Sequence, residues 1–254
     1  MGKFNRVTLS LVLSLWTMGC KPKRQVNTSE VLLVRDVSEV QLSVIKERIP
    51  IYLQSMSFSY KQEGCFARGY LMSADLARWD VPIETLNQTA SVAGQDLKTA
   101  DGIRWSYHTA PQYYYRGQPY VIDPAHASMP LTKREWTDRN NRNGVPTIVT
   151  INERNELGNS YFAAYRFQHS QNVDLNGSVN GAFRARTLYD STRWVSDMIG
   201  QESISPAEKT QKRQNLSILA KDIMRDLHTK NRLALEANES LAYWHNQIRA
   251  ITGF

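Results

Sequence analysis

Apolar residues recur at the period of a helix from Cys65 onward. Counted along the chain they fall at spacings of one, three and four, which line one face of a helix with 3.6 residues per turn. We therefore predict a helix from Cys65 to about Arg78. Unpaired amides and the helix dipole favour an anion at the first turn of a helix, so the position of Cys65 suits a thiolate. The apolar positions of this face are Phe66, Tyr70, Leu71, Ala74 and Ala77.

Further along the chain the helical period gives way to aromatic and β-branched runs. A polar loop rich in Gln, Asn and Thr follows Pro82. Residues 103–108, 113–115 and 120–122 are then strand-like, with a turn at residues 116–117. Such runs on either side of a two-residue turn predict a β-hairpin.

The predicted hairpin has a definite register. If residues 116–117 form the turn, Tyr115 faces Gln118, and counting outward places His108 opposite Ala125. Asp123 then lies diagonally across from His108 on the same face of the sheet. A bulge within the hairpin would shift this register by one residue.

The rest of the chain adds strands and then helices. Residues 147–151 and 161–167 are strand-like, and residues 205–208 carry a serine cap, a proline at the first helical position and a glutamate at the third. This capping box predicts the start of a helix. An apolar stripe follows, which we interpret as a packing face in the core or against a partner helix. Its members are Leu216, Leu219, Ile223 and Leu227, continued by Leu233, Leu241, Trp244 and Ile248.

The first residues have the pattern of an export signal. Lys3 and Arg6 precede an apolar stretch at residues 7–18, which is shorter than the roughly 20 residues that a membrane-spanning helix needs. Gly19 and Cys20 follow the stretch, and this ending resembles a bacterial lipoprotein signal, although Thr17 stands where such signals usually carry leucine. We predict that residues 1–20 are a signal peptide of the lipoprotein type and that Cys20 is lipidated.

A weakly patterned segment separates this signal from the folded part. Residues 21–40 are mostly polar and predict a tether, with order beginning near Val31. Pro50 interrupts the segment that follows, and residues 51–60 are mostly apolar or small.

The chain has two cysteines, Cys20 and Cys65. If Cys20 is lipidated or removed, Cys65 has no intramolecular partner in an oxidising compartment, where an unpaired thiol indicates reactivity. A Cys20–Cys65 disulfide and an inert buried thiol are the alternatives.

Composition and charge exclude few classes of binding partner. The 254 residues are 41% hydrophobic and 22% charged, with a formal charge of +7 and a pI near 9.4. This balance excludes a wholly disordered chain, and a basic charge suits an acidic partner. Lys and Arg are dispersed, however, and no nucleic-acid-binding motif is present, so we expect no nucleic-acid partner.

Three residues could perform nucleophilic cysteine chemistry. It needs a thiol that loses its proton, an imidazole that accepts and returns it, and an acceptor that orients the imidazole. Cys65, His108 and Asp123 fill these roles, and a thiolate beside an imidazolium and a helix N-terminus can have its pKa lowered to about 3.5–7.5. The alternatives are a structural histidine on a strand and a turn at Asp123-Pro124.

A metal site is not expected from the spacing. The five histidines are scattered without close pairs, and His126, three residues after Asp123, does not by itself define a site. We predict no metal and no cofactor.

Three separated blocks are centred on these residues. The blocks are Gly64-Cys65-Phe66-Ala67-Arg68, Trp105-Ser106-Tyr107-His108-Thr109-Ala110-Pro111 and Tyr120-Val121-Ile122-Asp123-Pro124, followed by Met129-Pro130-Leu131-Thr132 and Glu135-Trp136. They resemble the bacterial protein-glutaminase family, in the family's order, and the similarity covers about residues 60–140.

The resemblance implies an α+β fold with a papain- and transglutaminase-like core, in which the nucleophile helix packs on an antiparallel sheet. Residues 41–185 would form this catalytic domain, and residues 186–254 a C-terminal helical extension.

The resemblance also implies hydrolysis of the side-chain amide of protein-bound glutamine, with release of ammonia. Cys65 would be the nucleophile, His108 the acid and base, and Asp123 the orienting carboxylate. Trp105 and Tyr107 could wall the substrate site, although such aromatic residues also serve as sheet core.

A transglutaminase, a cysteine peptidase and a surface lipoprotein that acts as a binding or scaffold module are the alternatives. The expected partners are glutamine-bearing proteins or peptides and a membrane reached through the lipid anchor. We expect an exported protein, anchored in the bacterial cell envelope or secreted.

Overall fold

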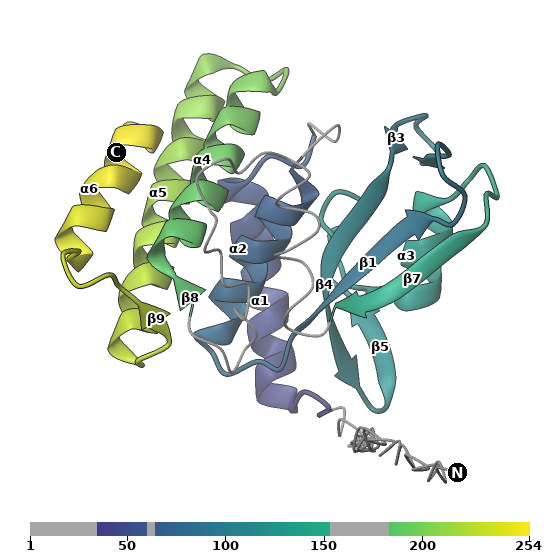
Figure 1. The fold of residues 1–254 in the computed structure, drawn as a ribbon, viewed down its shortest axis with the longest axis horizontal. Coiled ribbons are helices and arrows are strands. Elements are labelled where there is room, and N and C mark those ends of the chain that lie inside the picture. Colours follow the sequence, from purple (N-terminus) through teal and green to yellow (C-terminus); the bar gives the residue numbers. More distant parts are fainter. Residues whose placement is uncertain (1–34, 60–63, 153–182) are drawn as a thin grey trace, which may run out of the picture. The chain divides into compact units, whose positions relative to one another are not determined.

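The first helix, α1 (Glu39–Ser55), begins inside the predicted tether. The computed structural model describes residues 35–59, 64–152 and 183–254 (Figure 1). Ser38 caps α1, because its Oγ accepts the Gln41 amide at 3.2 Å while the Gln41 side chain accepts the Ser38 amide at 2.9 Å. This capping box starts the helix at residue 39. Residues 21–34 of the tether lie outside the described part.

Pro50 lies within α1, so the predicted interruption at this residue is wrong. A proline in a helix interior lacks the amide for one hydrogen bond and destabilises the helix by about 3 kcal/mol. Ile45, Ile49 and Tyr52 are fully or almost fully buried on either side of it. Burial of such side chains contributes roughly 1.5–3 kcal/mol each, which is enough to offset the loss.

The second helix, α2 (Cys65–Ala77), confirms the predicted helix. It starts after Gly64, whose backbone is left-handed with φ +77°. Ten of its residues are buried, because it lies between the sheet and the other helices (Figure 1). The helix therefore places the partly buried Cys65 at its first position, beside the hydrophobic core.

A five-stranded antiparallel sheet has the order β6-β5-β4-β1-β7. The polar segment after Pro82, predicted as a loop, contains the interior strand β1, which is a correction. Asn87 and Gln88 in β1 are buried, so the apolar alternation that marks a strand is missing from the sequence. The strands are β1 (Glu84–Ala90), β4 (Tyr107–Tyr115), β5 (Gln118–Val121), β6 (Leu131–Thr132) and β7 (Thr147–Asn152).

The β4–β5 hairpin has the predicted turn and register, with Tyr115 paired to Gln118. The hydrogen bond from the Ile122 amide to the Pro111 carbonyl, 2.9 Å, continues that register. The chain then turns away at Asp123, so His108 does not lie opposite Ala125 as predicted. Its partner in the sheet is Gln88 of β1.

Short elements complete the sheet region. Helix α3 (Lys133–Asn140) starts at a capping box formed by Thr132 and Glu135. The predicted strand at 147–151 is confirmed as β7, and the one predicted at 161–167 lies outside the described residues. Two small pairs also form: β2 (Leu97–Lys98) with β3 (Arg104–Trp105), and β8 (Phe183–Arg184) with β9 (Leu233–Ala234).

The C-terminal helices are α4 (Ala185–Gln201), α5 (Pro206–Thr229) and α6 (Leu241–Thr252). The capping box predicted at residues 205–208 starts α5, with the Glu208 amide donating to Ser205 Oγ at 3.2 Å. The predicted apolar stripe of α5 is buried. Its buried members are Leu216, Leu219, Ile223 and Leu227.

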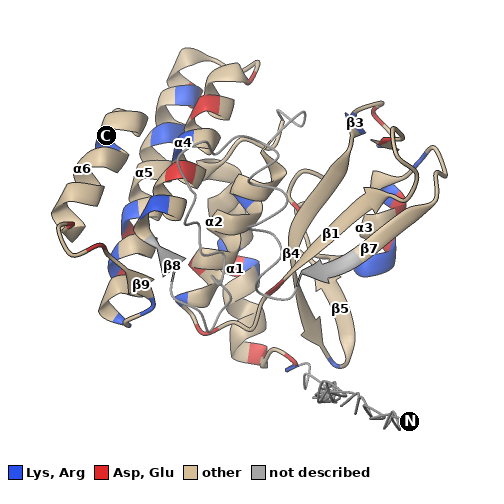
Figure 2. Ribbon diagram, viewed as in Figure 1, with Lys and Arg blue, Asp and Glu red and all other residues tan. Residues whose placement is uncertain are grey.

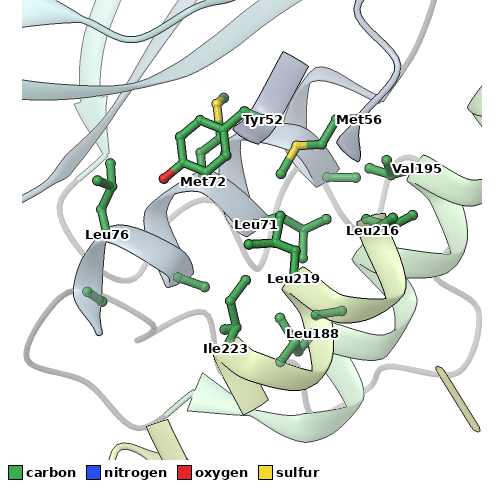
Figure 3. Close-up of a cluster of buried hydrophobic side chains, with 14 of the residues drawn as sticks. Tyr52, Met56, Leu71, Met72, Leu76, Leu188, Val195, Leu216, Leu219 and Ile223 are labelled. Carbon is green, nitrogen blue, oxygen red and sulfur yellow. The ribbon is translucent and has the colours of Figure 1, made fainter. Parts of the chain in front are cut away.

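These helices share one core with α1 and α2. Figure 3 shows Leu71 of α2 close to Leu219 of α5, with Leu188 and Ile223 of the C-terminal helices beside them, and Tyr52 of α1 belongs to the same cluster. The predicted boundary between residues 185 and 186 falls inside α4. The helical extension therefore packs as part of the same hydrophobic core as the nucleophile helix.

The overall class is α+β, as predicted. Charged residues lie mainly on the helices, and β4 carries none (Figure 2). Among the described helices, none combines the length and the apolar character needed to span a bilayer.

Candidate active site

The end of the β4–β5 hairpin brings His108 and Asp123 together. His108 Nε2 lies 2.7 Å from Asp123 Oδ2, and both side chains are buried. Their predicted proximity is confirmed, although the turn after β5, rather than continued strand pairing, places the carboxylate. This contact supplies the acceptor that orients an imidazole.

Three donors hold the Asp123 carboxylate. Besides His108, Trp136 Nε1 donates to Oδ2 at 2.8 Å, and the Ala125 amide donates to Oδ1 at 3.1 Å. Burial favours the protonated form, but the charge and hydrogen bond of His108, the charge of His126 and the Trp136 donor hold the pKa of Asp123 well below its usual range. The carboxylate is therefore ionised when His108 carries a proton.

The other nitrogen of the His108 ring is left open. Nδ1 is buried and has no hydrogen-bond partner among the described residues. Trp105 stacks on the ring, with centroids 4.0 Å apart and an interplanar angle of 12°. Because the ionised carboxylate accepts a hydrogen bond from Nε2–H, neutral His108 presents an unprotonated Nδ1. This nitrogen can accept a proton.

The Cys65 thiol lies against the strand that carries His108. The backbone of Thr109, the residue after His108, hydrogen-bonds the thiol, as does the backbone of Phe66 at the start of α2. Strand β5 leaves β4 after Ile122, and along the described part its pairs reach only Gln112. The edge of β4 beside His108 is therefore open to the helix N-terminus that carries Cys65.

The pKa of the Cys65 thiol differs from the value expected from the sequence. Burial raises the pKa of the Cys65 thiol, and the charge of Arg68 and the backbone hydrogen bonds only partly oppose it. Burial also lowers the pKa of His108, against the effect of Asp123. The prediction of a depressed thiol pKa is thus corrected. Desolvation outweighs the helix N-terminus, so the resting pair is a neutral thiol and a neutral imidazole.

Arg68 is a buried cation one helical turn after Cys65, with a side chain 2% exposed. Its Nη1 donates to the Ser57 carbonyl at 3.0 Å, and its guanidinium lies 5.5 Å from the centre of the Phe58 ring. Side chains on a helix lean toward its N-terminus, which brings this charge to the Cys65 end of α2. Arg68 therefore favours negative charge at the Cys65 sulfur.

Helix α4 packs behind the turn that carries Cys65. Trp194 packs edge-on against Phe66, with ring centroids 5.6 Å apart. A Cβ atom added at Gly64 would lie 2.0 Å from Met198 Sδ. The turn before Cys65 is thus closed by a side chain of the predicted extension.

This contact predicts the effect of Gly64→Ala. Gly64 has φ +77° and no room for a Cβ, whereas Gly94 has φ +79° and nothing within 4 Å of the position a Cβ would take. The two alanine variants share the backbone strain, so Gly64→Ala is expected to lose about 1–2 kcal/mol more unfolding free energy than Gly94→Ala because of overpacking. Chemical denaturation of both variants measures the difference.

The double variant Gly64→Ala/Met198→Ala serves as the control for this clash. The added methyl then occupies the space that the thioether leaves, so the two changes should couple favourably by at least about 0.5 kcal/mol. Equal destabilisation by Gly64→Ala and Gly94→Ala would show that Met198 does not prevent a Cβ atom from fitting at position 64.

His108, Asp123 and His126 form the group of described residues whose donor atoms could surround a metal ion, since these atoms all lie within 4.8 Å of one another. Each is already engaged in hydrogen bonds. Trp136 also uses Asp123 Oδ2, and His126 Nε2 lies 2.6 Å from Asn140 Oδ1. Hydrogen bonding accounts for this arrangement, and we assign no metal ligands.

The remaining predicted site residues have distinct locations. Trp105, 5% exposed, covers the His108 ring, and Tyr107, 7% exposed, packs in the main core. Cys20 lies outside the described residues, and Cys65 is a free cysteine.

Four contributors escaped sequence reasoning: Gln88, His126, Trp136 and Asn140. Trp136 lies in one of the blocks that carry the family resemblance, but nothing in the spacing connects it with Asp123. Gln88 lay in a segment predicted as a loop. Only the tertiary fold brings the four together.

The fold and this site define an α+β protein with a cysteine, a histidine and an aspartate gathered at one open strand edge. Residues 37–140, which contain all three, match a family described as glutaminase. This match supports an amidohydrolase.

Two solved structures are similar to the chain. The NMR structure of protein-glutaminase from Chryseobacterium proteolyticum shares 23% identity and covers 46% of this chain and 72% of its own, with a TM-score of 0.36. The crystal structure of a mutant of pro-protein-glutaminase shares 20% identity and covers 43% of this chain and 47% of its own, also with a TM-score of 0.36. No curated protein matches the chain.

Proposed function

We propose that this protein deamidates protein-bound glutamine through a thioester on Cys65. The observation that carries the proposal is the state of His108: Asp123 binds Nε2 at 2.7 Å, while Nδ1 is buried without a partner beside the residues that contact the thiol. An imidazole held at one nitrogen and open at the other is arranged to move a proton at the open atom.

The first half of the reaction forms the thioester. Cys65 Sγ attacks the glutamine Cδ as its proton passes to His108 Nδ1, and the backbone amide of Cys65 at the start of α2 stabilises the resulting oxyanion. The C–N bond then breaks as the imidazolium returns its proton to the leaving nitrogen. The products of this half are ammonia and an acyl-enzyme.

The second half consumes water. His108 Nδ1 accepts a proton from the water molecule as its oxygen adds to the thioester carbonyl. The C–S bond breaks, and Sγ takes the proton back from His108. Free Cys65 and a glutamate side chain result, so water is the only co-reactant of the complete cycle.

The neutral resting pair gives Asp123 a specific role in these steps. Each half places a positive charge on His108 for a short time, in a buried site that disfavours that charge. An ionised carboxylate at 2.7 Å stabilises the imidazolium when it forms and fixes the ring when it is neutral.

The location of the enzyme is also a proposal. The signal pattern of residues 1–20 and the cysteine at position 20 support an exported protein held at a membrane by lipid on Cys20. Palmitate labelling in cells, compared with a Cys20→Ala variant, tests the anchor. Equal labelling of the two chains would contradict it.

The substrate and the acyl acceptor can be tested together. The full-length chain is incubated with a glutamine-rich protein, and separately with free glutamine, each with and without a primary amine. We expect ammonia from the protein substrate and a mass gain of about one dalton per converted side chain, because hydrolysis replaces an amide with an acid. Activity on free glutamine should be much lower.

Other products would identify the competing activities. Lysine cross-links or incorporated amine would indicate a transglutaminase, and peptide fragments would indicate a cysteine peptidase. If no protein substrate releases ammonia, the protein is better explained as a binding or scaffold module.

A further inference from the structure

A second imidazole lies beside the catalytic histidine, in the turn that carries Asp123. The amides of His126 and Ala127 donate to the Asp123 carbonyl at 2.9 and 3.1 Å. This turn places the His126 ring 5.5 Å from the His108 ring, nearly perpendicular to it, with Nε2 3.8 Å from Asp123 Oδ2. The side chain of His126 is only 7% exposed.

Hydrogen bonds join His126 to helix α3 and strand β1. His126 Nε2 lies 2.6 Å from Asn140 Oδ1, Asn140 Nδ2 donates to Gln88 Oε1 at 3.0 Å, and Gln88 Nε2 donates to the Thr137 carbonyl at 3.2 Å. Asn140 and Gln88 are fully buried. Gln88 is also the partner of His108 in the sheet, so the chain of bonds returns to the catalytic strand.

The direction of these bonds fixes the proton on His126. Since Asn140 uses its amide group as a donor to Gln88, its Oδ1 must accept, and His126 Nε2 carries the hydrogen. A buried polar network of this kind is stable only when each member is satisfied. Loss of the His126 donor would leave Asn140 Oδ1 buried without a partner.

We propose that His126 is a positioning residue of this active site: through Asn140 and Gln88 it fixes the turn that holds the Asp123 carboxylate against His108. This role rests on the proposed function of the triad. His126 acts through Asp123 and His108 and need not touch the substrate.

Charged groups from each neighbouring element face this pair of imidazoles. Asp123 faces both rings, Arg139 of α3 donates to the His126 carbonyl at 2.7 Å, and Arg68 of α2 acts on His108. Burial is the main cause that lowers the pKa of His108, Asp123 opposes it, and the charges of His126 and Arg68 add to the lowering. A neutral residue at position 126 should therefore let His108 take up a proton at a higher pH.

Two variants of the full-length protein separate the hydrogen bond from the charge. His126→Phe keeps a ring but removes the donor, whereas His126→Gln places an amide donor close to the position of Nε2. The readouts are kcat for ammonia release from a glutamine-rich protein and the titration of His108, followed by NMR with labelled histidine. The second readout needs no substrate.

We expect kcat to fall about 10- to 100-fold in His126→Phe, as for loss of a buried hydrogen bond, and to return within about threefold of the native value in His126→Gln. His108 should titrate at a higher pH in both variants. A purely structural role would not move the titration in a folded, active Gln variant.

Three outcomes would overturn the proposal: native kcat in His126→Phe, equally low kcat in both variants, or an unchanged His108 titration. If the native protein releases no ammonia from protein glutamine, the proposed reaction fails. The titration of His108 still decides whether His126 acts on it.

Discussion

Replacing Cys65 with alanine should reduce ammonia release from protein glutamine to the uncatalysed background, a loss of about 10⁴-fold or more in kcat. The thioester needs the sulfur atom, and neither His108 nor Asp123 can replace it as the nucleophile in the proposed route. The decisive measurement is steady-state ammonia release, with circular dichroism to show that the variant is folded.

Cys20→Ala is the matched control, since it removes the other cysteine of the chain. It should retain the native rate in a solution assay, because Cys20 has no role in the proposed reaction. Ammonia release that survives Cys65→Ala unchanged would rule out the thioester mechanism.

Asp123→Asn should lower kcat by about 10³- to 10⁴-fold while leaving the fold intact. An amide facing His108 can donate to Nε2, which moves the imidazole proton to Nδ1. Nδ1 then has no lone pair to accept the Cys65 proton, and the imidazolium loses its counter-charge. The same substitution at Asp138, an exposed residue of α3 whose side chain is 63% accessible, is the control and should have no effect.

The pH profile of Asp123→Asn gives an independent check on its residual activity. Asp123 raises the pKa of His108 against burial, so without the carboxylate that pKa falls further. Because neutral His108 is the active form, the acid limb of kcat/KM should move to lower pH. The shift is opposite to that expected for the His126 variants. If the acid limb of kcat/KM stays at the native pH, a group other than His108 determines its position.

The features that the sequence predicted correctly depend on local patterns. The α2 helix, the 116–117 turn and the capping box of α5 are each encoded by neighbouring residues. The proximity of His108 and Asp123 was also predicted from local sequence, by counting residues outward from the turn of the short hairpin that joins them. The turn after Ile122 could not be predicted, because partners on α3 help to fix it.

The features that were missed depend on distant partners. Strand β1 has a polar sequence, and Gln88 is tolerated in the core because Asn140 and Thr137 bond its side chain. The raised pKa of Cys65 likewise reflects burial under helices that no local pattern relates to it. Periodicity reports which face of an element is apolar and does not report which polar groups satisfy one another.

The packing of Met198 and Trp194 around the nucleophile turn also constrains how the protein matures. Both residues belong to α4, and a chain emerging from the ribosome exposes Cys65, His108 and Asp123 well before α4 has been made. Domains fold as units once their residues are available, so the wall behind the thiol forms only when α4 packs on α2. Cys65, His108 and Asp123 therefore all lie in the chain before the described surroundings of the thiol are complete.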